Sequence, residues 1–398
     1  GILTRRKLRP LEEIQGDISG LMVQLIGGVS KLRISGAENR AFAHWSRKYT
    51  KQLKLMLSSQ LIEDLVGLFN ILIPTVASIN IFVLSANIMF EQYPQDASPL
   101  TAGTFLAFNS AFGTFMGGVI GLSNTIISIL EVVVLWGRAK PILEATSEID
   151  LSKADPGKLS GKVELEHISF RYREDGPLNL DDVNIKAARG EFIALVGPSG
   201  SGKSTIIRLL LGFDTPEVGT VYYDGQDLSG LDISAIRRQL GVVLQNGRFN
   251  SASIFENISG GALITMDEAW DAAKMAGFAE DIHGMPMGMH TVISEGGTNL
   301  SGGQRQRLLI ARSLVLKPKI LIFDEATSAL DNRTQAIVSE SLDQLQVTRI
   351  VIAHRLSTIR NADRIYVIEA GRVVQQGNFQ KLSQQEGLFA NLMARQMA

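Results

Sequence analysis

The chain has 398 residues, a length that favours two or more structural units. Its 45% hydrophobic and 20% charged content excludes a self-repelling disordered chain and leaves an apolar excess whose position has to be found. The absence of cysteine excludes disulfides, thiolate nucleophiles and cysteine-ligated metals, and the net charge of −1 argues against a protein that coats nucleic acid.

The first 60 residues form a basic segment. Eleven Lys and Arg residues stand against four acids, which is a net charge of +7. The segment has the helical periodicity of a cytosolic arm, interrupted by Gly27, Gly28 and Gly36. The sequence begins without a methionine and no cleavable signal precedes the arm, so we expect the chain to be the C-terminal part of a longer membrane protein.

Two uncharged stretches follow, over residues 65–90 and 97–130. Each is longer than the roughly 20 residues that a helix needs to cross a bilayer. The intervening segment 91–96 has no Lys or Arg, whereas the flanks are basic and include Arg138 and Lys140. The positive-inside rule therefore predicts two transmembrane helices with both flanks in the cytoplasm. Core helices of a large soluble domain are the alternative, although soluble helices of this length usually carry charges.

The second stretch carries Gly113, Gly117 and Gly121 on one helix face, which allows close approach of another helix. Two helices alone do not enclose a transport pathway, so we expect further transmembrane helices, either elsewhere in a longer polypeptide or in other subunits. Five asparagines are predicted to hydrogen-bond between helices, with the lining of a substrate path as the alternative: Asn70, Asn80, Asn87, Asn109 and Asn124.

Beyond Trp136 the composition changes, and Pro141, Asp155, Pro156 and Gly157 mark a linker. The predicted organisation is a cytosolic arm at 1–60, two membrane helices at 61–140, a linker at 141–160 and an α/β domain at 161–398. Four apolar runs are expected to form a parallel sheet: 192–196, 242–244, 320–323 and 349–353. Four more are expected to form a meander beside it: 163–172, 183–187, 220–223 and 365–374.

A glycine-rich loop directly follows the first of the parallel strands and runs into a helical pattern at 206–211. This is the order of strand, loop and helix that a phosphate-binding P-loop requires. Glycines let backbone N–H groups surround a polyphosphate, while Lys203 reaches the β and γ oxygens and Ser204 ligates Mg²⁺. The candidate nucleotide-binding residues are Gly197, Ser199, Gly200, Ser201, Gly202, Lys203, Ser204 and Thr205.

Two acidic residues, Asp324 and Glu325, follow the apolar run at 320–323. A carboxylate at the tip of a parallel strand beside a P-loop is where Mg²⁺ needs a further ligand, and a second carboxylate is placed to orient or deprotonate the attacking water. We therefore assign Asp324 to the metal and Glu325 to the catalytic base. A solvated acidic turn is the alternative.

A second anion site is predicted ahead of the basic amphipathic stretch 305–315. Ser301, Gly302 and Gly303 would leave free N–H groups at a helix N-terminus. Because one domain then has two phosphate-binding helix ends, we expect two domains to pair head to tail, each covering the other's nucleotide. The residues of this second site are Leu300, Ser301, Gly302, Gly303 and Gln304.

The loop 197–205, the motif 300–304, the segment 320–325 and His354 together resemble the nucleotide-binding domain of ATP-binding-cassette (ABC) transporters, and the membrane spans resemble the exporter branch of that family. The resemblance implies a helical membrane segment joined to an α/β P-loop NTPase domain. That domain would have a parallel sheet core, an antiparallel β subdomain and a helical subdomain. The resemblance further implies ATP and Mg²⁺ as cofactors and ATP hydrolysis as the reaction.

The resemblance also assigns roles to single residues. Tyr172 would stack on adenine, Gln245 would bind the metal and face the membrane domain, and Asp331 would link the two nucleotide sites. His354 would contact the γ-phosphate and join Glu325 and Gln245 as a catalytic residue. The alternatives are a core tyrosine, an ordinary loop glutamine and a capping histidine.

A finer resemblance concerns the arm. Residues 26–45 are similar to the cytoplasmic loop of exporters whose coupling helix rests on the partner's ATPase domain. Together with 293–297 they resemble NHLM-type exporters of bacteriocins and other peptides. That family would have six membrane helices per subunit, and the partner would be a second copy or a homologous half-transporter.

The implied function is ATP-driven export of a peptide across the bacterial cytoplasmic membrane, by a multi-pass protein whose nucleotide-binding domain is cytoplasmic. Export of lipids or small hydrophobic compounds is one alternative. Another is a soluble cassette ATPase acting on nucleic acid or the ribosome, although the long coiled coil, second cassette or basic patch typical of that class is missing from this sequence. A non-transporting regulator is the third. We expect no nucleic-acid partner.

Overall fold

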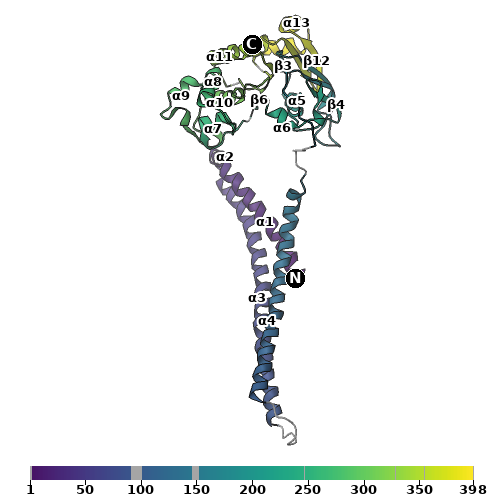
Figure 1. The fold of residues 1–398 in the computed structure, drawn as a ribbon, viewed down its shortest axis with the longest axis vertical. Coiled ribbons are helices and arrows are strands. Elements are labelled where there is room, and N and C mark those ends of the chain that lie inside the picture. The colour runs from purple at the N-terminus through teal and green to yellow at the C-terminus, as the bar shows by residue number, and fades with distance from the viewer. Residues whose placement is uncertain are drawn as a thin grey trace. The chain divides into compact units, whose positions relative to one another are not determined.

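The computed structural model describes residues 2–90, 101–145, 152–245, 247–327, 329–353 and 355–397. The chain divides into two compact units, Gly1–Thr146 and Ser147–Ala398 (Figure 1). In its described residues the first unit is helical, and the second combines β-sheets with shorter helices.

Four helices build the described part of the first unit, with the bounds α1 (Ile2–Gly27), α2 (Val29–Ile34), α3 (Glu38–Phe90) and α4 (Ala102–Leu143). Of the glycines predicted to interrupt the arm, Gly27 is the last residue of α1, and Gly28 and Gly36 lie between the helices. Position 60, where the sequence suggested that the arm ends, lies inside α3. The last part of the arm, from Glu38, and the first apolar stretch therefore belong to one continuous helix.

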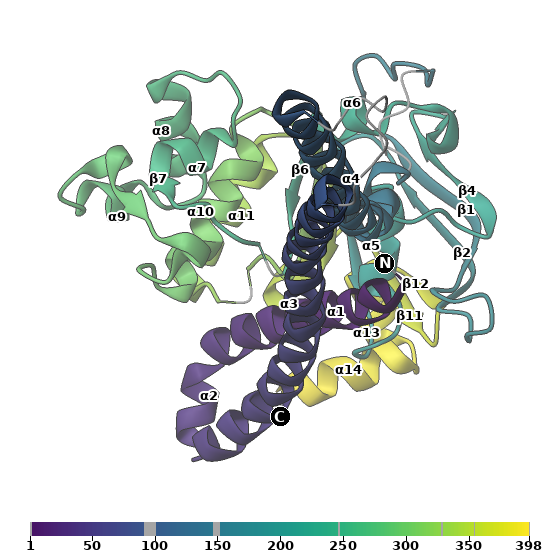
Figure 2. The same cartoon turned by 90° about the horizontal axis from the view of Figure 1, so that it is seen from below.

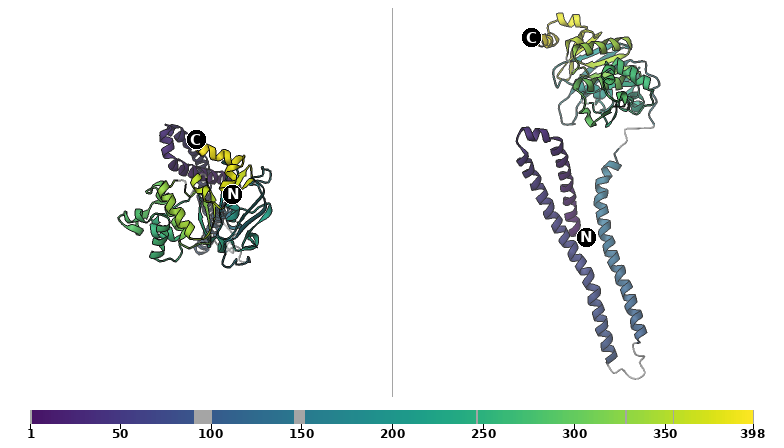
Figure 3. Two further views of the ribbon diagram at one scale, coloured as in Figure 1. Left: turned by 90° about the horizontal axis from the view of Figure 1, so that it is seen from above. Right: turned by 90° about the vertical axis from the view of Figure 1, so that its left-hand side faces the viewer.

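The basic arm folds back on itself. α1 runs antiparallel to the first part of α3, with α2 at the turn between them (Figure 3). Ile14 and Ile18, one helical turn apart on α1, are buried. Asp17 of α1 forms an ion pair with Lys48 of α3 at 3.6 Å. α1 thus carries buried apolar residues and is tied to α3 by the ion pair of Asp17 with Lys48.

Two helical segments are long and apolar enough to cross a membrane, Glu38–Ile88 and Ala102–Ile126, with mean hydropathies of 2.0 and 1.5 over their most apolar windows. Those windows are not buried within the chain, so they are unlike core helices of a soluble domain. The predicted loop 91–96 lies outside the described residues. On α4, a Cβ added at Gly113, Gly117 or Gly121 would meet nothing within 4 Å. This face is open to a further helix, as the glycine spacing predicts.

The second unit is organised around a six-stranded sheet with the strand order β12-β11-β3-β10-β9-β6. Its strands are β3 (Phe192–Val196), β6 (Leu240–Val243), β9 (Ile320–Asp324), β10 (Thr348–Ile352), β11 (Arg364–Glu369) and β12 (Arg372–Gly377). Five of them run parallel, and β12 pairs antiparallel with β11 at one edge. Every residue of β3 and β9 is buried, as expected for strands covered on both faces. The predicted parallel core is confirmed.

The prediction for residues 365–374 is wrong in one respect, because this run belongs to the central sheet. It comprises β11 and β12, which are separated by a turn at Ala370 and Gly371 with φ values of 46° and 79°. β11 pairs in parallel with β3. The four apolar residues from Ile365 to Ile368 are all buried. Such an unbroken apolar run indicates a strand covered on both faces, whereas a meander strand alternates.

A separate four-stranded antiparallel sheet has the order β2-β1-β4-β5. Its bounds are β1 (Val163–Phe170), β2 (Leu180–Ala187), β4 (Val218–Tyr223) and β5 (Gln226–Asp227). One large apolar cluster fills the space between this sheet, α5 (Lys203–Leu210) and one face of the central sheet. The antiparallel β subdomain implied by the resemblance is therefore present.

Helices gather on the other side of the central sheet (Figure 2). They are α7 (Ile254–Ser259), α8 (Met266–Met275), α9 (Ala279–His283) and α10 (Gly302–Leu314), with the short pair β7 (Ala252–Ser253) and β8 (Val292–Ile293). A second apolar cluster joins them to the sheet. The remaining helices are α6 (Ile233–Arg237), α11 (Asn332–Gln344), α12 (Leu356–Arg360), α13 (Phe379–Gln384) and α14 (Leu388–Met397).

The second half of the predicted linker is docked on the second unit. The backbone N–H of Ala154 donates to the carbonyl of Gly230, and the carbonyl of Ala154 accepts from Asp232 (2.8 Å). The side chain of Gln239 bonds the backbone of Gly157 and Leu159. Helix α4 continues to Leu143, so the predicted linker 141–160 overlaps the end of this helix as well as the docked segment from Ala154.

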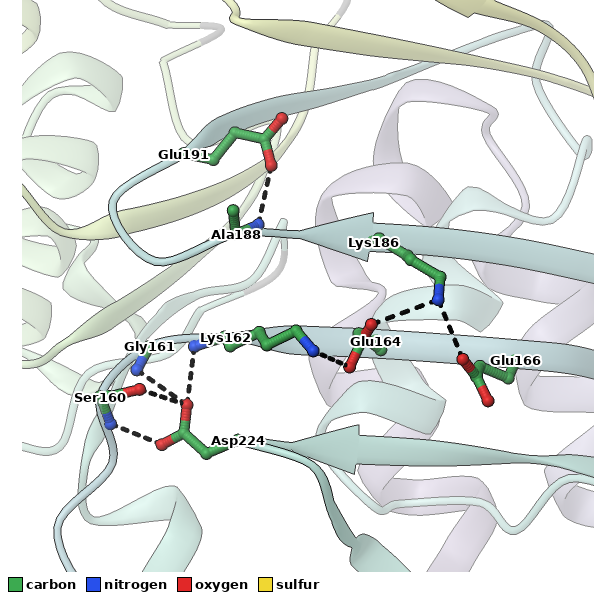
Figure 4. A network of polar contacts seen from close by, with 9 residues as sticks. All are labelled: Ser160, Gly161, Lys162, Glu164, Glu166, Lys186, Ala188, Glu191 and Asp224. Carbon is green, nitrogen blue, oxygen red and sulfur yellow. Dashed lines mark hydrogen bonds and ion pairs between the residues drawn. The ribbon is translucent and has the colours of Figure 1, made fainter.

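Asp224, at the turn between β4 and β5, holds the start of β1 in place (Figure 4). Its carboxylate accepts from the hydroxyl and N–H of Ser160 and from the N–H groups of Gly161 and Lys162, at 2.5 to 3.2 Å. Burial alone would raise the pKa of Asp224, but these hydrogen bonds outweigh it and hold the pKa below its usual range. On the neighbouring strand, Glu164 lies between two lysine ammonium groups (Figure 4).

We expect Asp224→Ala to lower the free energy of unfolding by about 1–3 kcal/mol at pH 7, because several donors lose a charged acceptor. Asp224→Asn should lower it less, because asparagine tolerates the positive φ of this position and keeps one acceptor oxygen. The pKa of the Asp224 carboxyl in the folded protein lies below its value of about 3.9 in the unfolded chain. The contribution of the charge is therefore present above that pH and is lost as the pH falls through the folded pKa. Urea unfolding of the solubilised chain at several pH values measures both effects.

Asp175→Ala is the matched control, because the Asp175 side chain is exposed. It should change the free energy of unfolding by less than about 0.5 kcal/mol. A loss with Asp224→Ala that is no larger than the control, or that grows as the pH falls below 4, would contradict the assigned role.

Candidate nucleotide site

The glycine-rich loop lies at the carboxyl edge of the central sheet, between the end of β3 and the start of α5. Gly197 passes so close to the neighbouring strand that an added Cβ would lie 2.0 Å from the carbonyl oxygen of Ile368. Gly202 caps α5 with a φ of 106°, a conformation that favours glycine. The first N–H groups of α5 have no acceptor within the helix and face the loop. The chain therefore forms a phosphate cradle at the predicted place.

Lys203 is buried beneath this loop. Its Nζ donates to the carbonyl oxygens of Gly197 (2.9 Å) and Pro198 (2.7 Å) and to Oγ of Ser201 (3.4 Å). Burial lowers the pKa of Lys203, and the charges of Glu325 and Asp324 act in the opposite direction. A polyphosphate in the loop would further favour the charged ammonium group. The electrostatics of the loop thus suit an anionic ligand.

Ser204 and Asp324 are 120 residues apart in the sequence and meet at the mouth of the loop. Ser204 Oγ donates to Asp324 Oδ2 at 3.3 Å. Asp324 is the last residue of β9 and pairs with Ile352 of β10, which in turn pairs with Leu195 of β3. Because the three strands are parallel, their carboxyl ends lie at the same edge. This register brings the carboxylate to the hydroxyl.

Glu325 follows in an unusual backbone conformation. Its φ of 54° is positive, which is uncommon for a residue other than glycine and is often associated with functional sites. Its backbone N–H donates to the carbonyl of Ile352 (3.2 Å). Gln245, just beyond the end of β6, donates from Nε2 to Glu325 Oε2 at 3.3 Å. Four of the predicted polar residues, Ser204, Asp324, Glu325 and Gln245, thus lie together at the sheet edge.

Tyr172 lies beside the loop. Its hydroxyl is 3.1 Å from Oγ1 of Thr205, and its ring meets the ring of Phe170 edge to face at 5.0 Å between centroids. The side chain is 54% exposed. The alternative of a buried core tyrosine is therefore wrong.

The second predicted anion site is the start of α10. Ser301 caps this helix: its Oγ accepts from the N–H of Gln304, and its own N–H donates to Gln304 Oε1. Gln304 Nε2 donates to Asp281 Oδ1 at 3.0 Å, so this side chain turns into its own domain. Leu300 is buried, whereas Ser301 and Gly302 are exposed. The exposed helix end presents backbone N–H groups outward.

Asp331 caps α11 by accepting from the N–H (2.9 Å) and hydroxyl of Thr334. These hydrogen bonds lower the pKa of Asp331. His354 lies outside the described residues. The neighbouring Arg355 donates to the carbonyl of Leu330 (2.7 Å), and this bond fixes the loop that leads to Asp331.

Sequence reasoning missed two residues of this region. Asp281 accepts from both Gln304 and Arg307, and thereby fixes the first turns of α10. Gln306 contacts two backbone groups of the loop after β9. Gln306 lies four residues after Gly302, on the same helix face, and this spacing was the available signal. Asp281 had no comparable signal, because its contacts depend on how α9 packs.

Comparisons with known proteins agree with this geometry. The family described as "ABC transporter" matches residues 180–328. The alpha-hemolysin translocation ATP-binding protein HlyB of Escherichia coli O6:H1 is 40% identical over 314 residues, covering 78% of this chain and 44% of that protein. The toxin RTX-III translocation ATP-binding protein of Actinobacillus pleuropneumoniae is 40% identical over 311 residues, covering 77% and 44%. The chain thus spans less than half the length of these relatives.

A solved structure covers both units. The structure titled as a bacterial Atm1-family ABC exporter with ATP bound superposes with a TM-score of 0.87 at 30% identity. The match covers the whole of this chain and 71% of that one. Helical unit, central sheet, glycine loop and capped α10 are therefore parts of one known architecture. The chain belongs to the ABC exporter family.

Proposed function

We propose that this chain is part of an exporter subunit that hydrolyses ATP to move a polypeptide across the bacterial cytoplasmic membrane. The observation that carries the proposal is the cluster at the sheet edge, where Ser204 meets Asp324 and Gln245 meets Glu325, each at 3.3 Å. A loop for phosphate beside two carboxylates is the arrangement that phosphoryl transfer to water requires.

The residues present suit Mg²⁺. A hydroxyl from Ser204, a carboxylate from Asp324 and an amide oxygen from Gln245 are the oxygen donors that this ion prefers. We propose that these three residues hold it. When bound, the ion neutralises charge on the phosphate oxygens.

Other side chains at the same edge of the central sheet would carry out the remaining steps of ATP binding and hydrolysis. Glu325, oriented by Gln245, would accept a proton from the attacking water. Lys203 and the loop N–H groups would hold the β- and γ-phosphates, with Tyr172 against the adenine ring. We propose that His354 contacts the γ-phosphate.

A second subunit would complete the site. In each subunit the exposed end of α10 at Ser301 would cap the partner's nucleotide. We propose that the partner is a second copy or a homologous half-transporter, and that Asp331 lies at the junction. ATP then drives closure because it binds the closed pair more tightly than the open one.

Membrane export is the second half of the proposal. Helices α3 and α4 would cross the membrane with their basic flanks in the cytoplasm, and α2 would act as the coupling helix against a partner's nucleotide-binding domain. Two relatives are named for translocation of alpha-hemolysin and of toxin RTX-III, which are protein cargoes and support a polypeptide substrate here. Export of lipids or small hydrophobic compounds is the alternative cargo class.

Carbonate extraction tests the membrane half of the proposal. Membranes from cells expressing the chain should retain it after carbonate treatment, because about 20 or more apolar residues in each span resist extraction. The retained fraction should hydrolyse ATP only with Mg²⁺ added. Release of the chain into the supernatant would favour the alternative of a soluble cassette ATPase.

A further inference from the structure

Gln306 joins two regions that the proposed function places at different nucleotide sites. It lies on α10, one turn behind the capped helix end at Ser301. Its Oε1 accepts from the backbone N–H of Ala329 at 2.8 Å, and its Nε2 donates to the backbone carbonyl of Glu325 at 3.4 Å. One side chain therefore connects the helix that would cap the partner's ATP to the loop that carries this domain's own base.

The start of α10 also contacts the same loop directly. A Cβ added at Gly303 would lie 3.4 Å from the carbonyl oxygen of Ala329, and one added at Gly302 would lie 3.8 Å from the Ala329 Cβ. The helix end, Ala329 and Glu325 therefore form one contiguous group. A displacement of the helix end acts on the loop through both Gln306 and the glycine contacts.

The loop after β9 is suited to respond to a displacement of the α10 end. Glu325 is held with a positive φ, and a residue in that sparsely populated region keeps its conformation only while its neighbours maintain it. Both backbone polar groups of Glu325 are bonded: its N–H donates to the carbonyl of Ile352, and its carbonyl accepts from Gln306. Loss of the Gln306 contact would allow the carboxylate to leave its place beside Gln245.

We propose that Gln306 is a positioning residue that couples capture of the partner's nucleotide by α10 to the placement of Glu325 in its own site. It does not touch nucleotide; it acts on the backbone of Glu325 and Ala329. This inference rests on the proposed function and adds to it a route by which each site controls the other's base.

The test is a double-mutant cycle in the full chain. Gln306→Met keeps the side-chain length and removes both hydrogen bonds. It should lower kcat for ATP about tenfold, because small displacements of a base have effects of that size or larger. The KM for ATP should change less than about twofold. In a chain that already carries Glu325→Gln, adding Gln306→Met should cause no further loss of single-turnover rate, because Gln306 acts through Glu325.

Two further readouts separate coupling from a merely structural role. ATP-dependent pairing of the Glu325→Gln chain should be unchanged by Gln306→Met. Gln306→Glu keeps the acceptor for Ala329 and loses the donor to Glu325, so its kcat should fall as far as that of Gln306→Met. Gln344→Met is the control, because Gln344 is exposed at the end of α11, and its kcat should stay at the wild-type value.

Any of three results would overturn the inference. Gln306→Glu could keep full turnover, the rate losses of Gln306→Met and Glu325→Gln could multiply in the double variant, or Gln306→Met could abolish the ATP-dependent pairing of the Glu325→Gln chain. Its failure is distinguishable from that of the proposed function. Normal turnover in the single variant Glu325→Gln would show that Glu325 is not the base, which contradicts the proposed function. Lost turnover in Glu325→Gln together with full turnover in Gln306→Met would contradict only the coupling role of Gln306.

Discussion

Replacing Glu325 by glutamine should lower steady-state ATP turnover by about 10²–10⁴-fold, the range contributed by a positioned general base. The amide has nearly the same shape but accepts no proton from water at neutral pH. The hydrogen bond from Gln245 reaches a side-chain oxygen, and glutamine retains one. Nucleotide binding should therefore survive, and hydrolysis measured as phosphate release should not.

Retained binding has a second consequence that is measured independently. If ATP closes two copies and only hydrolysis opens them, the Glu325→Gln chain should accumulate as a pair when ATP and Mg²⁺ are added. Light scattering after size exclusion in detergent should then report about twice the protein mass. Glu340→Gln is the matched control, because Glu340 is exposed on α11. It should hydrolyse ATP like the wild type and form no lasting pair. Rapid turnover in Glu325→Gln would remove this residue from the role of base.

The glycine loop and its flanking elements were predictable because every part of them is local in sequence. An apolar run followed by closely spaced glycines and then a helical pattern specifies a strand, a tight loop and a helix end within about twenty residues. The pairing of Ser204 with Asp324 also followed, although the residues lie far apart, because two buried strands in a parallel sheet end at the same edge.

The remaining contacts depend on tertiary packing, which periodicity does not encode. The bonds of Gln306 require α10 to lie against the loop after β9, and the bonds of Asp281 require α9 to pack beside α10. Strand partners were a similar case. The apolar run at 365–368 indicated a strand, but its partner, β3, lies about 170 residues earlier in the chain. Sequence patterns predicted where strands and helices form, but they predicted less well which of these elements lie next to each other.

Lys203→Ala should weaken ATP binding and thereby lower hydrolysis strongly at ATP concentrations near the wild-type KM. The ammonium group is buried among loop carbonyls, where an anion would be its natural partner. Charge-assisted hydrogen bonds of this kind contribute about 1.5–3 kcal/mol, so affinity should fall by about ten- to a hundredfold or more. Thermal unfolding with and without ATP measures the loss, because a ligand that binds the folded state raises the midpoint.

A second variant distinguishes lost affinity for ATP from a damaged glycine loop. Lys203→Met keeps most of the apolar stem of the side chain and removes only the charge, so both variants should lose the ATP-dependent rise in midpoint if the charge is what binds. Lys319→Ala serves as the control, because that side chain is exposed before β9, and ATP should stabilise it as it does the wild type. A midpoint that rises with ATP in Lys203→Met as much as in the wild type at every ATP concentration would mean that backbone N–H groups and the helix end hold the phosphates without the lysine, and the electrostatic role assigned to Lys203 would be wrong.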